Sequence, residues 1–350
     1  KAGNLNYGLE HATGELIAIF DADFEPEADW LLQVVPHFQD PKIGLVQTRF
    51  THRNFRRNPL TRMAAMVLDT QMIVEFTALS GADILVNFFG SSGMWRRSCL
   101  DEHGGWKTYT LTEDIDMFMG AEIGGWKGAY LPTIVSEAEL PEQINAYLTQ
   151  QYRWSRGYAQ AYRHFAGKIF KAPWPFWNRM EVLTRFSYIF FFPTILIMLL
   201  LVLPVGLTGA PVFVYLGWTV IGGIGPFLML VLTRSEAFPR LRDRLAVLPA
   251  TGVIGIGLSL ECGLGVLAGL FKDGGVFRTT PKPGQASQDS ISRRTRLRRW
   301  LVALGEICLG AYLVLSVYIL WPTIGRFFAP WLLVSAFSFW FVAAASILEK

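Results

Sequence analysis

The order of apolar and polar residues divides the chain into two unlike halves. Through residues 1–180, short apolar runs alternate with polar and charged stretches, as in a soluble α/β domain. Residues 181–350 hold long segments that are almost wholly apolar and have the length of about 20 residues that a bilayer core requires. Four segments of this kind cover residues 186–207, 212–232, 300–321 and 327–348. The pattern therefore predicts a soluble domain followed by an α-helical membrane domain with several spans.

A fifth apolar segment, residues 245–270, is long enough to span a membrane but has basic residues on both sides. Because Lys and Arg beside a span stay on the cytoplasmic side, these flanks predict that the segment enters and leaves through one face. Glu261 and several glycines within the segment point the same way. We therefore expect an interfacial or re-entrant segment rather than a full span.

Charge and composition agree with a membrane protein. Only 17% of the residues are charged, whereas about a quarter is usual for soluble domains. The net charge of +4 comes mostly from arginines between the apolar segments, so it favours membrane orientation and argues against nucleic acid as a partner. Cys99, Cys262 and Cys308 are far apart, which argues against a disulfide framework or a metal cluster. We expect a multi-pass protein of the inner (plasma) membrane with its soluble domain in the cytoplasm.

Two aspartates follow the first apolar run of the soluble half. Residues 16–20, "LIAIF", form a continuous apolar run, which is typical of a buried strand in a parallel sheet. Asp21 and Asp23 stand at its carboxyl end, where open α/β sheets bind ligands, and in an extended segment they point the same way. Such a pair suits a divalent cation that bridges a diphosphate. The alternative is a polar turn that closes the strand.

A second acidic group lies at a predicted helix start. In "TLTEDIDM", Thr112 is a candidate N-cap, and Glu113 and Asp114 are favourable in the first turn of a helix. Helix capping explains these residues as well as chemistry does. The functional interpretation makes Asp114 a general base that takes a proton from an acceptor hydroxyl.

The stretch "QQYRW" (150–154) lies within an amphipathic helix. Gln150, Arg153, Trp154 and Gly157 are spaced i, i+3, i+4 and i+7, which places them on one stripe. Arg holds a phosphate with two hydrogen bonds, Trp offers a flat face to a sugar ring, and Gly permits a close approach. The alternative is a solvated surface, although such a surface more often carries Lys and Glu.

In their order and spacing, these motifs resemble those of the family-2 inverting glycosyltransferases. The likeness is strongest to the processive cellulose-synthase-like branch, and within it to the glucomannan and mannan synthases. The motifs that carry it are "KAGNLN" (1–6), "DAD" (21–23), "QTRF" (47–50), "GSSGMWRR" (90–97), "GGW" (104–106), "TED" (112–114), "QQYRW" (150–154) and "VFRTTPK" (276–282). The resemblance implies a GT-A-type α/β sheet that binds a nucleotide sugar, followed by a multi-span membrane domain.

The resemblance also implies roles for residues that would contact the donor. Lys1 and Gly3 would lie close to the nucleotide sugar. Asp23 would hold a divalent cation, Mg²⁺ or Mn²⁺, on the diphosphate, with Asp21 beside it. Residues 272–299 would contain a gating loop, from which Thr280 and Lys282 would reach the nucleotide.

On the acceptor side, the resemblance implies that Asp114 is the catalytic base, with Glu113 beside it. Gln150, Arg153 and Trp154 would serve the diphosphate and the acceptor sugar. The family's first nucleotide-binding strand would then precede Lys1, so we expect a chain whose upstream part is missing.

The function that the resemblance implies is a processive β-glycosyltransferase that builds a polysaccharide and exports it through the membrane. Its partners would be UDP-glucose or GDP-mannose as donor, the growing polysaccharide as acceptor, the lipid membrane, and an accessory export subunit. One alternative is a transferase that adds a single sugar to a lipid. Another is a non-catalytic membrane subunit that keeps the fold.

Overall fold

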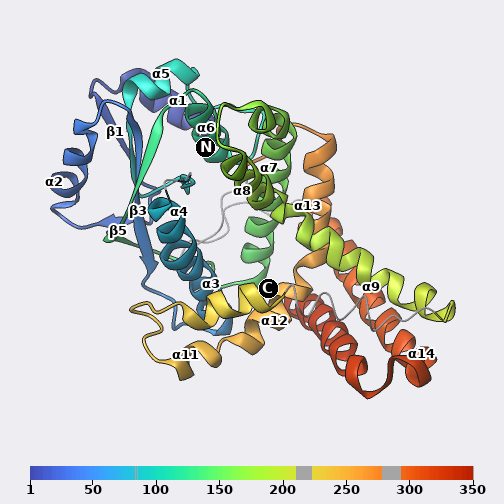
Figure 1. Cartoon of the computed structure of the whole chain (residues 1–350). Coiled ribbons are helices and arrows are strands. Elements are labelled where there is room, and N and C mark those ends of the chain that lie inside the picture. The colour runs from blue at the N-terminus through green and yellow to red at the C-terminus, as the bar shows by residue number, and fades with distance from the viewer. Residues whose placement is uncertain (83, 85, 210–222, 278–292, 350) are drawn as a thin grey trace.

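The first half of the chain folds around one sheet of five strands. The computed structural model describes residues 1–82, 84, 86–209, 223–277 and 293–349, and it places the sheet at one end of the molecule (Figure 1). The strands are β1 (Leu16–Ile19), β2 (Glu25–Pro26), β3 (Ile43–His52), β4 (Gly93–Arg96) and β5 (Lys127–Ala138). Their order across the sheet is β1-β4-β3-β5-β2.

β1 forms where residues 16–20 predict a strand, but the expected parallel pairing is wrong. β1 runs antiparallel to β4, with Leu16 opposite Arg96, and among the described strands only β3 and β5 pair in parallel. Because β1 lies at an edge of this sheet, it is only partly covered: Ile19 is buried, whereas Ala18 is exposed. An apolar run indicates that a strand is covered but does not identify its partner, which here lies far along the chain.

Helices cover both faces of the sheet, because neighbouring residues on a strand point to opposite faces. Leu45 and Trp95 pack into the core on one face, and their neighbours Val46 and Met94 pack into the core on the other. The helices on the first face are α1 (Ala2–His11), α5 (Arg97–His103), α6 (Glu113–Ile123), α7 (Ile144–Lys171) and α8 (Phe176–Ser187). The opposite face carries α2 (Trp30–Val34) and the 3₁₀ helix η1 (Val35–Gln39).

Four helices in the described part of the chain are long and apolar enough to cross a membrane. They cover Pro59–Gly81, Phe176–Leu207, Arg296–Pro322 and Phe328–Leu348. The last three overlap predicted spans. The first does not, and its residues pack against α7 and the apolar helix that begins at Leu248. It consists of α3 (Pro59–Asp69), the π-helix η2 (Thr70–Phe76) and α4 (Thr77–Gly81).

The later apolar helices include a hairpin and a long helix that packs against it. α8 continues through η3 (Tyr188–Phe190) into α9 (Phe191–Leu207). α14 (Arg293–Leu348) turns back on itself (Figure 1), so that Trp340 Nε1 donates to the carbonyl of Ile307 at 3.2 Å. Of the predicted span 212–232, the described residues contain the helix Gly223–Leu232, and the remainder lies outside them.

Residues 245–270 form a bent pair of helices rather than one straight rod. α11 (Leu241–Leu245) leads into α12 (Leu248–Gly257), which is followed by α13 (Ser259–Phe271). The direction of the chain changes by 46° between Gly257 and Ser259. This geometry fits either a broken span or the predicted re-entrant segment.

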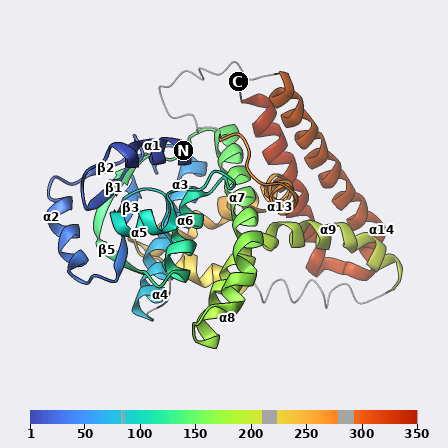
Figure 2. The same cartoon turned by 90° about the horizontal axis from the view of Figure 1, so that it is seen from above.

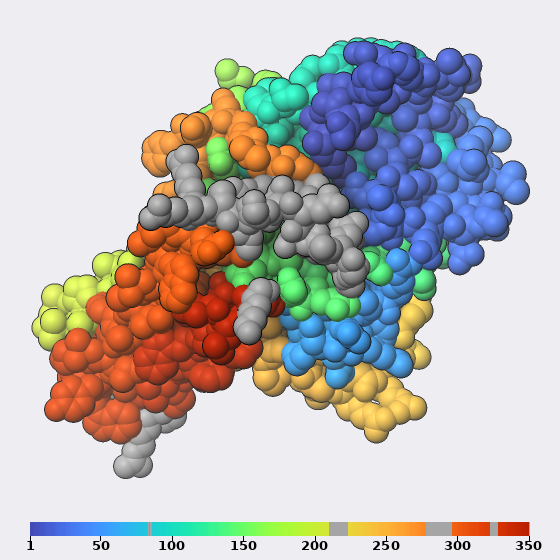
Figure 3. All heavy atoms as spheres, turned by 180° about the vertical axis from the view of Figure 1, so that it is seen from behind, coloured from blue at the N-terminus to red at the C-terminus, as the bar shows by residue number. Residues whose placement is uncertain are grey.

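α7 joins the two halves. Seen from above, it stands between the sheet and the apolar helices α9 and α14 (Figure 2), and from behind α14 lies at the opposite end of the molecule from the N-terminal residues (Figure 3). α13 packs closely along α7, since a Cβ on Gly269 would lie 2.3 Å from the carbonyl oxygen of Arg156. Arg49 on β3 also forms a two-pronged ion pair with Glu236, at 2.7 and 2.9 Å. The membrane-type helices are therefore fixed to the sheet domain at several points.

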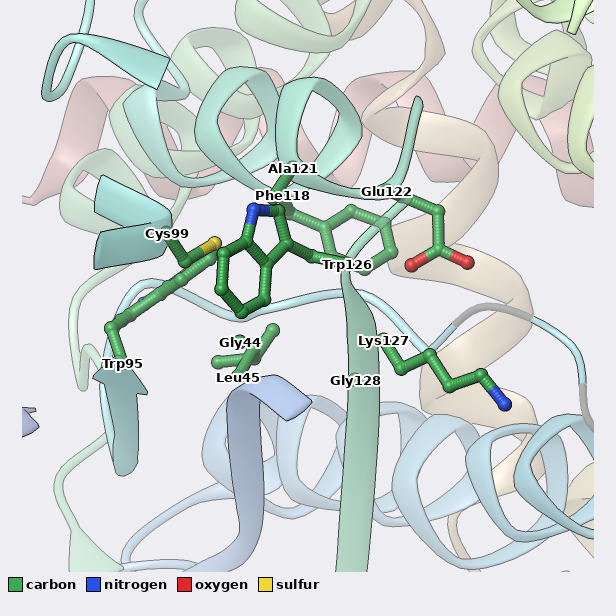
Figure 4. Close-up of a pocket in the computed structure, with 10 residues that line it drawn as sticks. All are labelled: Gly44, Leu45, Trp95, Cys99, Phe118, Ala121, Glu122, Trp126, Lys127 and Gly128. Carbon is green, nitrogen blue, oxygen red and sulfur yellow. The ribbon is translucent and has the colours of Figure 1, made fainter. Parts of the chain in front are cut away.

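α6 packs on the sheet over a glycine. Figure 4 shows Trp126, Cys99 and Trp95 around Gly44, with Phe118 of α6 above them. A Cβ on Gly44 would lie 2.8 Å from Cys99 Sγ and 3.1 Å from Trp126 Cε3, which is closer than van der Waals contact allows. The cavity beside these residues holds about 10 Å³, too little to absorb the displaced side chains.

Gly44→Ala is therefore expected to lower the free energy of unfolding by about 1–3 kcal/mol, the usual cost of overpacking a core. The control is Gly8→Ala on α1, where an added Cβ meets nothing within 4 Å and alanine is expected to stabilise the helix slightly. Denaturation of the purified protein, followed by tryptophan fluorescence, measures both. Equal stability of the two variants would contradict the packing described here.

Candidate functional site

Acidic and basic side chains from three distant segments meet beside the sheet. Lys1 Nζ lies 2.9 Å from a carboxylate oxygen of Asp21 and 3.8 Å from Glu113, and it donates to the carbonyl of Gly90 at 2.8 Å. Asp114 borders the same space, since its Oδ2 is 2.9 Å from the point where a Cβ on Gly90 would stand. The end of β1 and the start of α6 thus share one ammonium group.

The two aspartates of "DAD" lie on a turn, so the expected extended geometry is wrong. The turn is closed by the N–H of Phe24, which donates to the carbonyl of Asp21 at 3.0 Å. Asp21 is held by Lys1, whereas Asp23 accepts a long bond of 3.5 Å from the N–H of Glu139 at the end of β5. A turn is compatible with the ligand position at the strand end, because both carboxylates still follow β1 directly.

The loop before β4 supplies contacts that the sequence did not single out. Gly90 has φ of +76°, a conformation that favours glycine, and Ser91 Oγ accepts from the N–H of Asp21 at 2.9 Å. Gln47 holds this loop: its Nε2 donates to the carbonyl of Ser91 at 3.1 Å, and its Oε1 accepts from the N–H of Phe89 at 3.0 Å. The "QTRF" and "GSSG" motifs therefore act together to shape one wall of the site.

α6 begins at Glu113, with Thr112 at the N-cap position as predicted, but the expected side-chain cap is absent among the bonds of the described residues. The Thr112 hydroxyl instead lies 3.2 Å from that of Thr110. The backbone N–H groups of Asp114 and Ile115 donate to the Asp114 carboxylate. The Asp114 carboxylate rather than the threonine thus interacts with two free amides of the first turn, where negative charge is also favourable.

Asp114 has an unusual acidity for an aspartate. Burial, together with the negative charge of Glu113, raises its pKa from 3.8 to about 7, against the opposing effects of Lys1 and the two backbone amides. The pKa of Lys1 is held above its usual value, because Asp21, Glu113 and Asp114 outweigh the effect of its burial. A carboxylate whose pKa lies near the working pH is suited to accept a proton during a reaction.

Arg153 brings the predicted stripe of α7 to this site. Burial lowers the pKa of its guanidinium, while the charges of Glu113, Asp114 and Asp21 act in the opposite direction. Its guanidinium carbon lies 4.3 Å from the centre of the Phe277 ring, a cation–π contact that the sequence did not predict. The positive charge of Arg153 thus lies close enough to these acids to interact with them.

Gly157 of the same stripe permits close packing, as predicted, and its partner is Thr112, through both side chain and backbone. A Cβ there would lie 2.4 Å from Thr112 Cγ2 and 2.8 Å from Thr112 N. Gln150 and Trp154, the other two residues of the stripe, are half-buried on α7. Their roles remain predictions.

Three other residues are predicted to contact the nucleotide sugar, and the described structure does not place any of them in this cluster. Gly3 is exposed on α1, and a Cβ on it would meet nothing within 4 Å. Thr280 and Lys282 lie outside the described residues. The roles that the resemblance implies for these three residues stay predictions.

Carboxylates suitable for a metal are present, but only as a pair. No group of three or more His, Cys, Asp or Glu that could hold a metal ion occurs within the described part of the chain. Mg²⁺ commonly takes one or two carboxylates and completes its shell with substrate phosphates and water. Asp21 and Asp23 therefore fit a cation that the protein and the substrate phosphates bind together, and they do not fit a cation that the protein binds alone.

Comparisons with known proteins agree with the motifs. The chain is 39% identical over 194 residues to the probable glucomannan 4-beta-mannosyltransferase 4 of Oryza sativa subsp. japonica, a match that covers 54% of this chain and 35% of that protein. It is also 39% identical over 191 residues to the glucomannan 4-beta-mannosyltransferase 9 of Arabidopsis thaliana, covering 53% and 36%. The chain therefore spans about a third of the length of these curated relatives.

A solved structure and a family description complete the comparison. A mannosyltransferase from Pyrobaculum calidifontis, solved with GDP-mannose and Mn²⁺, is 17% identical, with a TM-score of 0.43 over 77% of this chain and 66% of that one. That score is too low to carry a conclusion. Residues 16–208, more than half of the chain, match the sequence model of the family described as glycosyl transferase family group 2. The chain belongs to this family.

Proposed function

We propose that this chain carries the catalytic part of a membrane-embedded, inverting, processive β-glycosyltransferase. The observation that supports this most strongly is the Asp114 carboxylate, whose pKa burial and Glu113 raise to about 7, at a site that also gathers Lys1, Asp21 and Arg153. A scaffold without activity would have no need for these opposed charges in one place. The assembled site therefore argues against a non-catalytic subunit.

The proposed chemistry is a single displacement at the anomeric carbon of the donor sugar. Asp114 accepts the proton of the acceptor hydroxyl, whose oxygen forms the new glycosidic bond. The bond from the anomeric carbon to the diphosphate breaks on the opposite face, which inverts the configuration. Lys1 and Arg153 lie where they would stabilise the negative charge that develops on the leaving diphosphate. Gln150 and Trp154 would hold the acceptor sugar.

Asp21 and Asp23 would hold Mg²⁺ or Mn²⁺ together with the diphosphate, and the cation would supply further charge stabilisation to the leaving group. For Asp21 to serve, its ion pair with Lys1 at 2.9 Å must open or be shared with the cation. Lys1 would then be free to approach the phosphates.

The donor and product are inferred from the relatives. Their names describe glucomannan 4-beta-mannosyltransferases, which favours GDP-mannose over UDP-glucose and a β-linked, mannan-type polysaccharide as acceptor and product. A single-sugar transfer to a lipid is the second candidate, because the apolar helices lie beside the site. The length of the product distinguishes the two.

We further propose that residues 1–180 form the cytoplasmic catalytic domain and residues 181–350 the membrane domain of a multi-pass plasma-membrane protein. The apolar helices within Phe176–Leu207 and α14 support this arrangement, as does their attachment to α7. The hairpins would carry the growing polymer outward, alone or with an export subunit. Residues 272–299 would contain the gating loop.

The acidity of Asp114 gives a pH test of the proposed base. Asp114 must be ionised to accept a proton, so kcat/KM is expected to rise with pH through an apparent pKa of about 7. Glu113→Gln removes the negative charge that helps to raise this pKa, and the rising limb is therefore expected to move to lower pH. Release of the nucleoside diphosphate between pH 5.5 and 9 measures both profiles.

The control for the pH test is Glu27→Gln, an exposed glutamate outside the site, which should leave the limb in place. A limb that moves upward in Glu113→Gln, or a rate that does not change between pH 6 and pH 8, would contradict the assignment of Asp114.

Gly157→Ala tests whether α7 fixes the start of α6. The added Cβ must displace Thr112, the residue before Glu113, and a displacement of about 1 Å at a catalytic group costs about a hundredfold in rate. We expect kcat to fall about tenfold to a hundredfold. The matched control is Gly167→Ala on the same helix, where an added Cβ meets nothing within 4 Å. Wild-type kcat in a folded Gly157→Ala protein would be inconsistent with this account.

A further inference from the structure

We infer that Gln160 is a positioning residue. It fixes the segment before α6 and the segment after α13 in place relative to each other and to α7. Gln160 lies on α7, and its side chain is fully buried. Its kinetic consequence rests on the proposed function, whereas its structural consequence does not. No motif of the sequence pointed to it, although an uncharged polar residue on a buried helix face is a signal in itself.

One carboxamide makes three hydrogen bonds to two separate backbone segments. Its Oε1 accepts from the N–H of Leu111 at 2.9 Å, and its Nε2 donates to the carbonyls of Lys272 and Gly274, both at 2.8 Å. These partners are 49, 112 and 114 residues away along the chain. Buried backbone groups need partners, so loss of this amide leaves up to three of them unpaired.

The two segments that Gln160 joins lead to different groups of the proposed site. Leu111 immediately precedes Thr112 and the acids of α6. The other segment leaves α13 at Lys272 and reaches Phe277, whose ring lies under the guanidinium of Arg153 at 4.3 Å. A shift of the first segment would therefore move the acid pair, whereas a shift of the second would move the Phe277 ring relative to Arg153.

Neighbouring contacts show that the segment after α13 is docked as a unit. The N–H of Gly274 donates to the carbonyl of Tyr109, two residues before Leu111. Asp273 pairs with Arg163 and lies 2.9 Å from His164 Nε2, both on α7. Gly274 and Gly275 have φ of +62° and +147°, so this path requires glycine. Gln160 is the buried centre of these contacts, whereas the Asp273 pairs are partly exposed.

The chemistry of the side chain explains why glutamine suits this position. It offers an acceptor to Leu111 and donors to Lys272 and Gly274 at once. Glutamate keeps the acceptor but, when ionised, has no donor and repels the two carbonyls. Methionine has nearly the same shape and neither function. The two substitutions therefore separate the tie to α6 from the tie to the segment after α13.

The kinetic test uses Gln160→Glu and Gln160→Met in the protein in its membrane. In Gln160→Glu, we expect the KM for the nucleotide sugar to rise about tenfold while kcat stays within about threefold, because Leu111 remains tied. In Gln160→Met, kcat is also expected to fall about tenfold to a hundredfold, since the acid pair loses its support. The control is Gln143→Glu at the exposed start of α7, with KM and kcat unchanged.

A second readout needs no activity. Hydrogen exchange should show the Leu111 amide protected in wild type and in Gln160→Glu but fast in Gln160→Met, while Gly274 exchanges faster in both variants. Wild-type exchange at both amides in folded variants would overturn the inference, as would a fall of kcat with unchanged KM in Gln160→Glu. Should Gln160→Met fail to fold, Gln160→Glu alone decides. If wild type turns over no nucleotide sugar, the proposed function fails and the exchange pattern still decides on Gln160.

Discussion

Two adjacent carboxylates, the buried Glu113 and the half-buried Asp114, stand at the start of α6, and the surrounding structure compensates their charge. Burial and, after it, the negative charge of Glu113 raise the pKa of Asp114 from 3.8 to about 7. Lys1, the amides of the first helical turn and Arg153 provide the compensation. The balance leaves Asp114 basic enough to take a proton and still ionised in part near neutral pH.

The same constraint explains the importance of α7. Arg153 must stand near the acids, and Gly157 lets the helix approach Thr112 closely enough for this. On its other side, α7 packs against α13, where Gly269 again permits close contact. One helix thus carries the positive charge of the site and the attachment to the apolar helices. A movement of the membrane-type helices would therefore reach the catalytic acids through a rigid element.

Much of the site could be predicted because short local patterns encode it. The strand before Asp21, the helix start at Glu113 and the stripe that contains Arg153 all depend on residues near one another in sequence. The antiparallel pairing of β1 and the turn at Asp21 could not be read in this way, because they depend on β4 and on Ser91. The side-chain cap expected of Thr112 is missing among the described bonds, and the Asp114 carboxylate interacts with two of the helix amides instead.

Long-range contacts explain residues that the sequence motifs contain but whose partners the sequence did not predict. Gly90 is needed because Lys1 and Asp114 crowd the position of its absent Cβ, and no local pattern records this. Phe277 meets Arg153 only because the chain after α13 returns to the sheet domain. The family resemblance located the acids, whereas the three-dimensional arrangement was needed to find what holds them.

The most direct test of the central claim is the release of nucleoside diphosphate by the protein in membranes, assayed against a panel of nucleotide sugars. The account predicts release from one donor, GDP-mannose, and a loss of about a hundredfold or more in Asp114→Asn, the range expected when a general base is removed. Asp29→Asn, an exposed substitution away from the site, should have no effect. Release that Asp114→Asn leaves unchanged would contradict the account, because the charge around which the site is built would then have no part in the reaction.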